Sequence, residues 1–185
     1  MTTSNQTSVA VLLGSFRADS LNRRIAELLK AQAPAGVSVE IVEGLDQIPF
    51  YNEELDGDTA PEAAVALRAA VAKADRILAV TPEYNGTMPA VLNNAIDWLS
   101  RPYGQGAITG KPFAAVGATP TPYGGKWAHE HARHSANIAG ATVVDSIVLD
   151  QPALEGDLLT DDAAVQRFLG ALNDLVSYEV DPAAA

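Results

Sequence analysis

Short apolar runs alternate with helically periodic stretches along most of the chain. The apolar runs are rich in Val, Ile, Leu and Ala and are flanked by turn residues, which is typical of β-strands. They predict strands at residues 8–13, 37–42, 76–81, 112–118 and 142–149. Apolar residues at helical spacing predict helices at about residues 20–33, 61–73, 88–100, 125–139 and 160–177.

The strict alternation of strands and helices predicts an α/β fold, a doubly wound parallel sheet with helices on both faces. The strands at 8–13, 76–81 and 112–118 are almost continuously apolar, so we expect them to be buried on both faces. The strand at 37–42 is more mixed, which suits an edge of the sheet. Residues 44–60 form the long irregular excursion between elements.

Composition narrows the class of protein. The 185 residues are 48% hydrophobic, which suits one domain over residues 1–185, with flexible tails at 1–7 and 179–185. A formal net charge of -11 argues against nucleic acid or an anionic membrane as a partner. The absence of cysteine excludes thiol catalysis and thiolate metal sites. No apolar run approaches the roughly 20 residues of a membrane span, and no signal segment opens the chain, so we expect a cytoplasmic protein.

In open α/β sheets, ligands bind beyond the carboxyl ends of the strands, where the strand order reverses. The first such loop reads "GSFRADSLNRR" and leads into a helix. Free N–H groups at a helix start favour a phosphate, and Ser15, Ser20, Asn22 and Arg17 add further donors. The loop matches neither G-x-G-x-x-G nor the P-loop pattern, so neither a dinucleotide nor a nucleotide triphosphate is expected there. The alternative is a plain Ser20 cap beside a solvated Arg17.

Two further loops carry polar and aromatic residues. The strand at 76–81 is followed by "PEYNG", in which Tyr84 offers a flat face and an Asn-Gly pair suits a tight turn close to a ligand. The strand at 112–118 is followed by Thr119 and then by "PTPYGG", whose Gly pair allows close backbone approach to a flat group. Each loop taken alone could also be an ordinary surface turn.

Together these loops resemble the NADPH-dependent FMN reductase family, which includes flavin, quinone, azo-dye and chromate reductases. The resemblance rests on "GSFRADSLNRRIAELL", "IPFYNEEL", "AVTPEYNGTMPAVLNNAIDWLSRP" and "GATPTPYGGKWAHEHAR". The third stretch is the most specific, and the similarity runs from about residue 8 to about residue 175.

The resemblance implies a flavodoxin-like, doubly wound, five-stranded parallel sheet of order 2-1-3-4-5. It also implies FMN as cofactor, NADPH or NADH as electron donor, a small-molecule electron acceptor, and a homodimer or homotetramer. By position, the first loop would hold the FMN phosphate, the second would line the isoalloxazine ring, and the third would complete the other edge of the ring. The matching residues are Ser15, Arg17, Ser20, Leu21 and Asn22; Pro82, Glu83, Tyr84, Asn85 and Gly86; and Thr119, Tyr123, Gly124 and Gly125.

The flavin would carry the chemistry in such an enzyme, so no catalytic acid or base is expected. Two alternatives share the cofactor: an FMN electron carrier serving a protein partner, and a non-catalytic FMN sensor. The stretch "HEHARH" suggests a metal site, but His129 and His131 point to opposite faces of a helix, so we expect a solvated or interface face instead. Asp97 and Trp98 suggest a site built from an acid and an aromatic ring, but we expect the helix at 88–100 to pack at a subunit contact instead.

Overall fold

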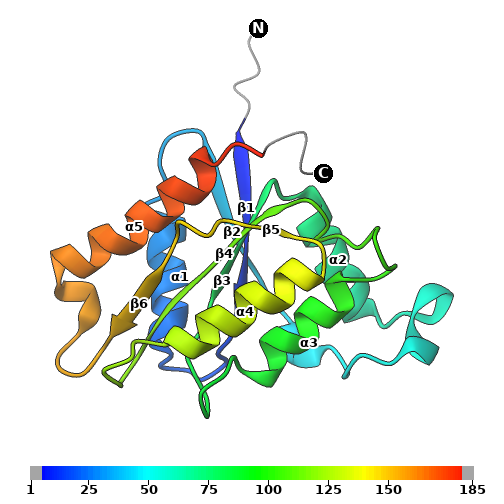
Figure 1. Ribbon diagram of the computed structural model, residues 1–185, viewed down its shortest axis with the longest axis horizontal. Helices are drawn as coiled ribbons and strands as arrows, with labels where there is room; N and C mark the ends of the chain where they lie inside the picture. The colour runs from blue at the N-terminus through cyan, green and yellow to red at the C-terminus, as the bar shows by residue number, and fades with distance from the viewer. Residues whose placement is uncertain (1–5, 181–185) are drawn as a thin grey trace, which may run out of the picture.

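The computed structural model describes residues 6–180, and its centre is a parallel β-sheet (Figure 1). The strands run in the order β2-β1-β3-β4-β5. The sixth strand, β6, also pairs with β4. This order confirms the flavodoxin-like sheet, including the edge position of the second strand. The bounds are β1 Thr7–Leu13, β2 Val37–Val42, β3 Arg76–Val80, β4 Pro112–Thr119, β5 Thr142–Val143 and β6 Leu149–Pro152.

Helices cover both faces of this sheet (Figure 1). Their bounds are α1 Leu21–Ala31, α2 Glu62–Lys73, α3 Ala90–Leu99, α4 Lys126–Ile138 and α5 Asp162–Ser177. Buried residues of α1 and α5 share one apolar cluster, and those of α2, α3 and α4 share the other. The five expected helices are confirmed, with ends that differ by one or two residues because terminal turns depend on local capping.

The central strands build the core because their side chains alternate between the two faces. In β1, Ala10 and Leu12 join the α2–α4 cluster, whereas Val11 and Leu13 join the α1–α5 cluster. All eight residues of β4 are buried. Burying one Val or Leu side chain stabilises the fold by about 1.5–3 kcal/mol. The continuous apolar runs therefore form the centre of the sheet, as the sequence predicts.

The fifth strand differs from the prediction of one strand over residues 142–149. It is divided into β5 and β6, with a turn closed by the Ile147 N–H donating to the Val144 carbonyl at 3.0 Å. β5 pairs with the start of β4 and β6 with its end, where Thr119 is opposite Pro152. The polar pair Asp145 and Ser146 lies in the turn between the two strands.

The start of the chain also differs from the expected flexible tail. Thr7 belongs to β1, and its N–H donates to the Gly36 carbonyl at 2.9 Å. Residues 1–5 and 181–185, which make up most of the expected tails, lie outside the described residues.

The excursion at 44–60 is anchored to α3 and α2. Trp98 of α3 is fully buried, and its indole N–H donates to the Pro49 carbonyl at 2.9 Å. Arg68 of α2 forms a two-pronged ion pair with Asp56 at 2.7 and 2.9 Å, and its guanidinium lies 5.3 Å from the centroid of the Trp98 ring. Trp98 therefore packs inside this chain and is not exposed on the surface of α3.

Candidate functional site

The carboxyl ends of β1, β3 and β4 meet closely enough to exclude side chains at two positions. A Cβ atom on Gly14 would collide with the side chain of Thr81, and one on Gly117 would collide with the Thr81 carbonyl. The Gly14 N–H donates to the Val80 carbonyl, and the Thr81 N–H donates to the Val116 carbonyl, both at 2.9 Å. This packing brings the three polar loops to one edge of the sheet, at the point where the strand order reverses.

The loop after β1 presents unpaired backbone N–H groups. Within the described part of the chain, the N–H groups of residues 15–19 donate to no backbone carbonyl, and the first such bond runs from Ser20 to Arg17 at 3.0 Å. The Ser20 side chain accepts from the Arg23 N–H and caps α1. Arg17 is exposed, and its guanidinium donates to the Asp19 carbonyl at 3.1 Å. Successive free N–H groups, a helix start and a guanidinium together suit an anion.

Asn22 and Leu21, two residues of the expected phosphate site, have side chains that contact other parts of the fold. Ser15 and Ser20 are buried at this edge, whereas the Asn22 amide bonds to β4. Asn22 donates to the Ala118 carbonyl and accepts from the Ala118 N–H, both at 2.9 Å. Leu21, the first residue of α1, is half-buried against the α1–α5 cluster. Asn22 thus ties the start of α1 to the end of β4, and this pair of hydrogen bonds uses both the oxygen and the nitrogen of its side-chain amide.

The loop after β3 forms a tight hairpin turn. Asn85 and Gly86 have φ angles of 53° and 72°, and Tyr84 and Thr87 exchange backbone hydrogen bonds of 2.9 and 3.1 Å. Positive φ at both central positions defines a type I′ turn, which favours Asn-Gly. Pro82 is buried, and the Tyr84 side chain is 51% exposed. The turn therefore holds an aromatic ring outside the core at this edge.

Glu83 connects the second loop to the third. Its carboxylate Oε2 accepts from the N–H groups of Trp127 and Ala128, at 3.0 and 3.3 Å. These groups belong to the first turn of α4, so Glu83 serves as the acidic cap of that helix. The sequence pattern gave no sign of this role because the two residues are 44 positions apart.

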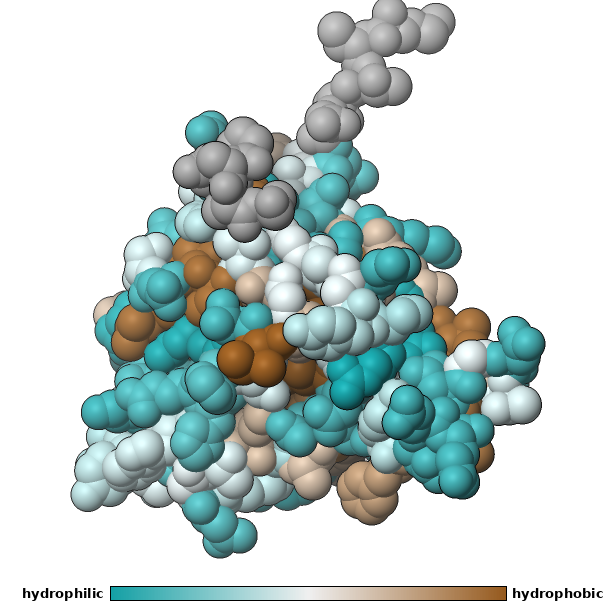
Figure 2. All heavy atoms as spheres, turned by 45° about the vertical axis from the view of Figure 1, so that its right-hand side comes forward, coloured by the Kyte–Doolittle hydropathy of each residue, from teal (hydrophilic) through white to brown (hydrophobic). Residues whose placement is uncertain are grey.

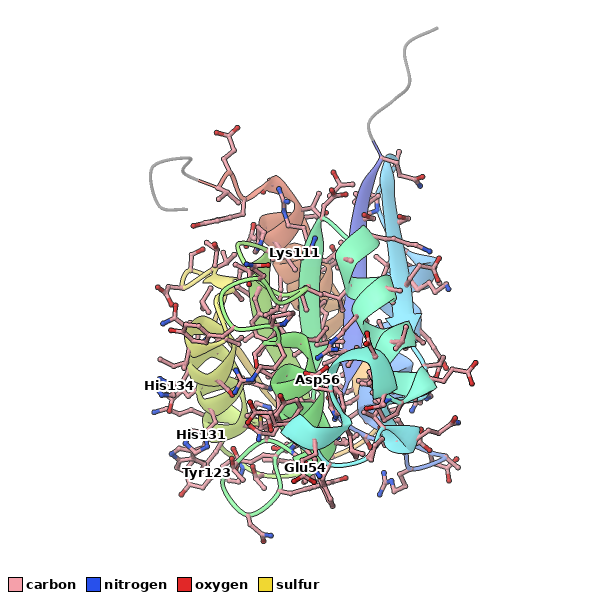
Figure 3. The ribbon with its side chains drawn as sticks, turned by 90° about the vertical axis from the view of Figure 1, so that its right-hand side faces the viewer. Glu54, Asp56, Lys111, Tyr123, His131 and His134 are labelled. Carbon is pink, nitrogen blue, oxygen red and sulfur yellow. The ribbon has the colours of Figure 1, made fainter. Side chains whose placement is uncertain are left out.

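The loop after β4 approaches closely to β6. Gly124 and Gly125 have φ angles of 63° and 94° and are buried, while Tyr123 is 58% exposed and packs against Trp127 at an interplanar angle of 53°, with ring centroids 4.7 Å apart. The Thr119 hydroxyl lies 3.0 Å from that of Thr121. Figure 3 places Tyr123 at the end of the molecule opposite Lys111, which precedes β4. The structure thus brings exposed aromatic rings to the same edge as the loop after β1.

His129 and Asp150 form a pair that sequence reasoning missed. His129 is fully buried, and its Nδ1 lies 2.8 Å from Asp150 Oδ1. This corrects the expectation that the "HEHARH" helix face is solvated. His131, in contrast, is exposed and bonds to the Thr87 hydroxyl at 2.8 Å. Among residues 6–180, no group of three or more His, Asp or Glu is arranged to hold a metal ion.

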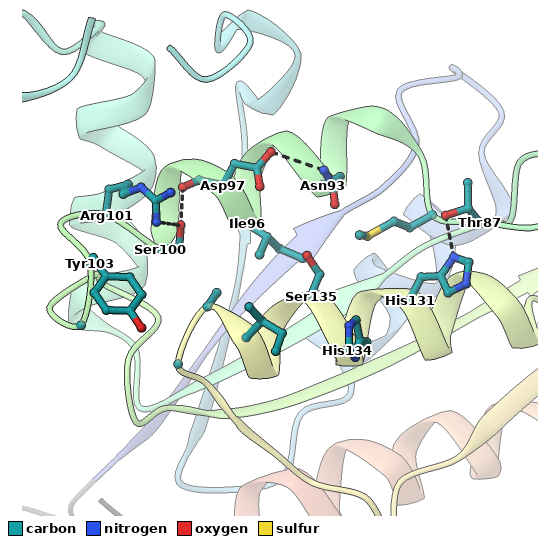
Figure 4. A pocket seen from close by; sticks show the side chains of 15 residues that line it. Thr87, Asn93, Ile96, Asp97, Ser100, Arg101, Tyr103, His131, His134 and Ser135 are labelled. Carbon is teal, nitrogen blue, oxygen red and sulfur yellow. Dashed lines mark hydrogen bonds between the residues drawn. The ribbon is translucent and has the colours of Figure 1, made fainter. Parts of the chain in front are cut away.

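A groove of about 750 Å³ runs between α3 and α4, beside the Tyr84 hairpin (Figure 4). Asp97 and Arg101 line its α3 side, and His131 and His134 line its α4 side. Burial raises the pKa of Asp97, and the nearby charge of Arg101 opposes that rise. Ile138 and Tyr103 also line the groove and are 69% and 86% exposed. The groove shares Thr87 with a neighbouring pocket at the hairpin.

The arrangement suits a mononucleotide with an aromatic head. The free N–H groups of residues 15–19 fit a single phosphate, and the loops carrying Tyr84 and Tyr123 fit a flat ring at the same edge. Fold and site together therefore define a flavodoxin-like protein with a site that fits FMN.

Comparison with known proteins identifies the family. Residues 7–153 match the model of the NADPH-dependent FMN reductase family, and the chain belongs to that family. It is similar to a quinone reductase of Pseudomonas putida, with 40% identity over 148 residues, covering 80% of this chain and 74% of that protein. A 2-hydroxy-1,4-benzoquinone reductase of a Burkholderia species is 39% identical over 146 residues, covering 79% of this chain and 76% of that protein.

Solved structures agree with this assignment. FerB, a flavoenzyme NAD(P)H:(acceptor) oxidoreductase from Paracoccus denitrificans, superposes with a TM-score of 0.77 and 29% identity, covering 93% of this chain and 96% of that chain. A flavodoxin from Pseudomonas aeruginosa shares the fold, with a TM-score of 0.58 and 20% identity, covering 90% and 99%. The protein is therefore an NAD(P)H-dependent oxidoreductase with FMN as its cofactor. Within residues 6–180, no helix is long and apolar enough to cross a membrane.

Proposed function

We propose that the protein reduces quinones, using FMN held at the carboxyl edge of the sheet and electrons from NADPH or NADH. Bound FMN supplies two-electron transfer, which the side chains of this cysteine-free chain do not provide. The single observation that carries the placement of FMN is the run of free backbone N–H groups at residues 15–19, beside the start of α1. Quinones are favoured as acceptors because two relatives at 40% and 39% identity carry quinone reductase names.

In this proposal the first loop binds the phosphate. Ser15 and Ser20 donate from their hydroxyl groups, Arg17 adds a charge-assisted bond, and the N–H groups of Leu21 and Asn22 lie at the start of α1. The Asn22 side chain acts indirectly, because its bonds to Ala118 fix the angle between α1 and β4. The chain thus binds the phosphate mainly through backbone groups, which bind an anion without carrying a full charge of their own.

The second and third loops flank the ring. Pro82, Tyr84, Asn85 and Gly86 lie along one side, with Glu83 holding the second loop against α4. Thr119, Tyr123, Gly124 and Gly125 lie along the other edge, where backbone N–H groups stabilise negative charge. The half-exposed Tyr84 and Tyr123 leave room for a flat donor or acceptor to stack in turn.

We also propose that the enzyme is a homodimer or homotetramer and that a second copy covers the α3–α4 groove. Exposed Ile138 and Tyr103 lie there beside the partly buried carboxyl of Asp97. In Figure 2 the right-hand side of Figure 1 is turned toward the viewer. Apolar side chains interrupt the hydrophilic surface in this view. Because reduced nicotinamides are cofactors of the cell interior, the proposal places the enzyme in the cytoplasm.

Anaerobic titration of the FMN-loaded protein tests the proposal. We expect the visible flavin absorbance to bleach within seconds on addition of NADPH or NADH and to return on addition of a benzoquinone. Bleaching by one nicotinamide only would identify the donor. A bound flavin that neither nicotinamide reduces at a catalytic rate would instead support an electron carrier or a sensor.

A further inference from the structure

A buried histidine lies beneath the third loop and takes no part in the function proposed above. His129 belongs to the first turn and a half of α4, and its side chain is 0% exposed. Its Nδ1 lies 2.8 Å from Asp150 Oδ1 of β6. A carboxylate only accepts hydrogen bonds, so we assign a proton to Nδ1. Nε2 is buried and bonds to nothing within residues 6–180.

The imidazole ring lies against the backbone of Gly125. A Cβ atom on Gly125 would lie 3.0 Å from both Cε1 and Nε2 of His129, and 3.6 Å from the methyl group of Thr119. Gly124 is equally confined, because its Cβ would lie 2.6 Å from the Gln151 nitrogen. The peptide that joins the two glycines is therefore held between the imidazole and β6.

Three hydrogen bonds tie β6 and the residue after it to this loop, to the end of β4 and to α4. The Gln151 N–H donates to the Gly124 carbonyl at 3.0 Å, and the Ala153 N–H donates to the Thr119 carbonyl at 2.9 Å. The third bond is the one between His129 and Asp150, which alone uses side chains. The Gln151 bond fixes the carbonyl of the Gly124–Gly125 peptide, and the imidazole, held by Asp150, is the group that lies against the Gly125 side of the same peptide.

Packing alone does not explain a histidine at this place. A buried nitrogen without a partner destabilises the protein, and an apolar side chain of similar volume would avoid that cost. A hydrogen bond differs from an apolar contact because it fixes direction as well as distance. We propose that His129, oriented by Asp150, is a positioning residue that holds the Gly124–Gly125 peptide against the edge of the flavin ring. The inference rests on the proposed function, in which these glycines lie at that edge.

The proposal makes a distinction between the two ends of the cofactor. A defect at Gly124–Gly125 weakens contact with the ring, so it lowers affinity for FMN and for lumiflavin, which has the ring but no phosphate. A defect in the first loop lowers affinity for FMN alone. The ratio of the two dissociation constants therefore reports which end has changed.

Four variants test it, with dissociation constants measured by quenching of flavin fluorescence. His129→Leu removes the hydrogen bond to Asp150, and we expect both flavins to bind about tenfold more weakly, because binding must then order the Gly124–Gly125 peptide at a cost comparable to one hydrogen bond of ordinary strength. His129→Asn places an amide nitrogen close to the position of Nδ1, and we expect affinity within about threefold of wild type. His129→Gln places it near Nε2, and we expect no such rescue. Glu130→Gln, on the exposed face of the same helix, is the control and should bind both flavins as wild type does.

Asp150→Ala provides a second route if His129→Leu does not fold. Its side chain is 25% exposed, so its removal leaves no closed cavity, and we expect the same parallel loss for both flavins. Wild-type affinity for lumiflavin in either folded variant would overturn this inference and leave the proposed function intact. Failure of the wild-type protein to bind FMN would overturn the proposed function and this inference together.

Discussion

Gly125 shows how one residue connects backbone geometry to the site. Its φ of 94° is a conformation that residues with a side chain rarely adopt, and the space for a Cβ is taken by the His129 ring. We expect Gly125→Ala to lower the free energy of unfolding by about 1–3 kcal/mol and to weaken FMN binding, as measured by urea unfolding and by flavin titration.

Gly170 is the matched control for that substitution. It lies inside α5, and nothing lies within 4 Å of the position of its Cβ. Gly170→Ala should leave FMN binding unchanged and stabilise the protein by roughly 0.5–1 kcal/mol, because Ala favours a helix. Equal effects of the two substitutions would contradict the role given to Gly125.

Arg17 is the side chain of the first loop that carries a full positive charge. In Arg17→Ala we expect FMN to bind with about tenfold or greater loss, the effect of one charge-assisted hydrogen bond to phosphate, and lumiflavin to bind as in wild type. Arg24 is a control of the same type on α1, because its guanidinium pairs with Asp157 at 2.7 Å. An equal loss of FMN affinity in Arg24→Ala would show that net charge, and not the Arg17 contact, is responsible.

At the scale of elements, α4 depends on a cap that comes from another loop. Glu83 accepts hydrogen bonds from two N–H groups in the first turn of α4. Its negative charge therefore stabilises the positive end of that helix. We expect Glu83→Gln to lower the free energy of unfolding by about 0.5–2 kcal/mol, measured by thermal or urea unfolding. Glu130→Gln on the same helix is the control, because Glu130 is exposed and pairs with Lys126 at a distance of 4.0 Å. It should change stability by less than about 0.5 kcal/mol.

The 44–60 excursion gives the fold a dependence on acid. The Arg68 guanidinium is the main cause that lowers the pKa of Asp56 from its ordinary 3.8 to about 2. A carboxyl whose pKa is lowered by folding contributes stability above its unfolded pKa, and this stability is lost as the pH falls from about 4 to about 2. At pH 7 we expect Asp56→Asn to be less stable than wild type by on the order of 1–2 kcal/mol.

Urea unfolding at several pH values checks this expectation. The difference between wild type and Asp56→Asn should shrink as the pH falls below 4 and nearly vanish near pH 2. Asp46→Asn, in the same excursion, is the comparison, and its difference from wild type should be small at every pH. A constant difference for Asp56→Asn would mean that the carboxyl charge does not anchor the excursion.

At the scale of the whole molecule, the α3–α4 groove is the proposed contact between copies. Ile138 lines it and is 69% exposed, so a charge there would be buried by a second copy at high cost. We expect Ile138→Glu to convert the oligomer to monomers, as seen by analytical ultracentrifugation. Val65→Glu places the same charge at a 50% exposed position on α2, outside the groove, and should leave the assembly intact. Wild-type protein that sediments as a monomer would contradict the proposal.

Much of this fold could be predicted because the apolar or mixed composition of each strand indicates how deeply that strand is buried. The apolar runs of β1, β3 and β4 lie at the centre of the sheet, and the mixed run of β2 lies at its edge. The division of β5 from β6 could not be predicted, because residues 142–149 are apolar enough for one strand, and only pairing with both ends of β4 separates them. The Asn-Gly turn, in contrast, depends on local φ preferences and was visible in the sequence.

The sequence by itself determined the alternation of elements, the three polar loops and their resemblance to FMN reductases, because these depend on local pattern. Only the tertiary structure decided which polar groups are free to bind a ligand. Asn22 bonds to Ala118, Glu83 caps α4, and His129 is buried on Asp150, whereas the N–H groups of residues 15–19 stay without backbone partners in the described chain. A side chain's partner is set by segments distant in sequence, so no local pattern reveals whether a polar group holds the fold or faces the cofactor.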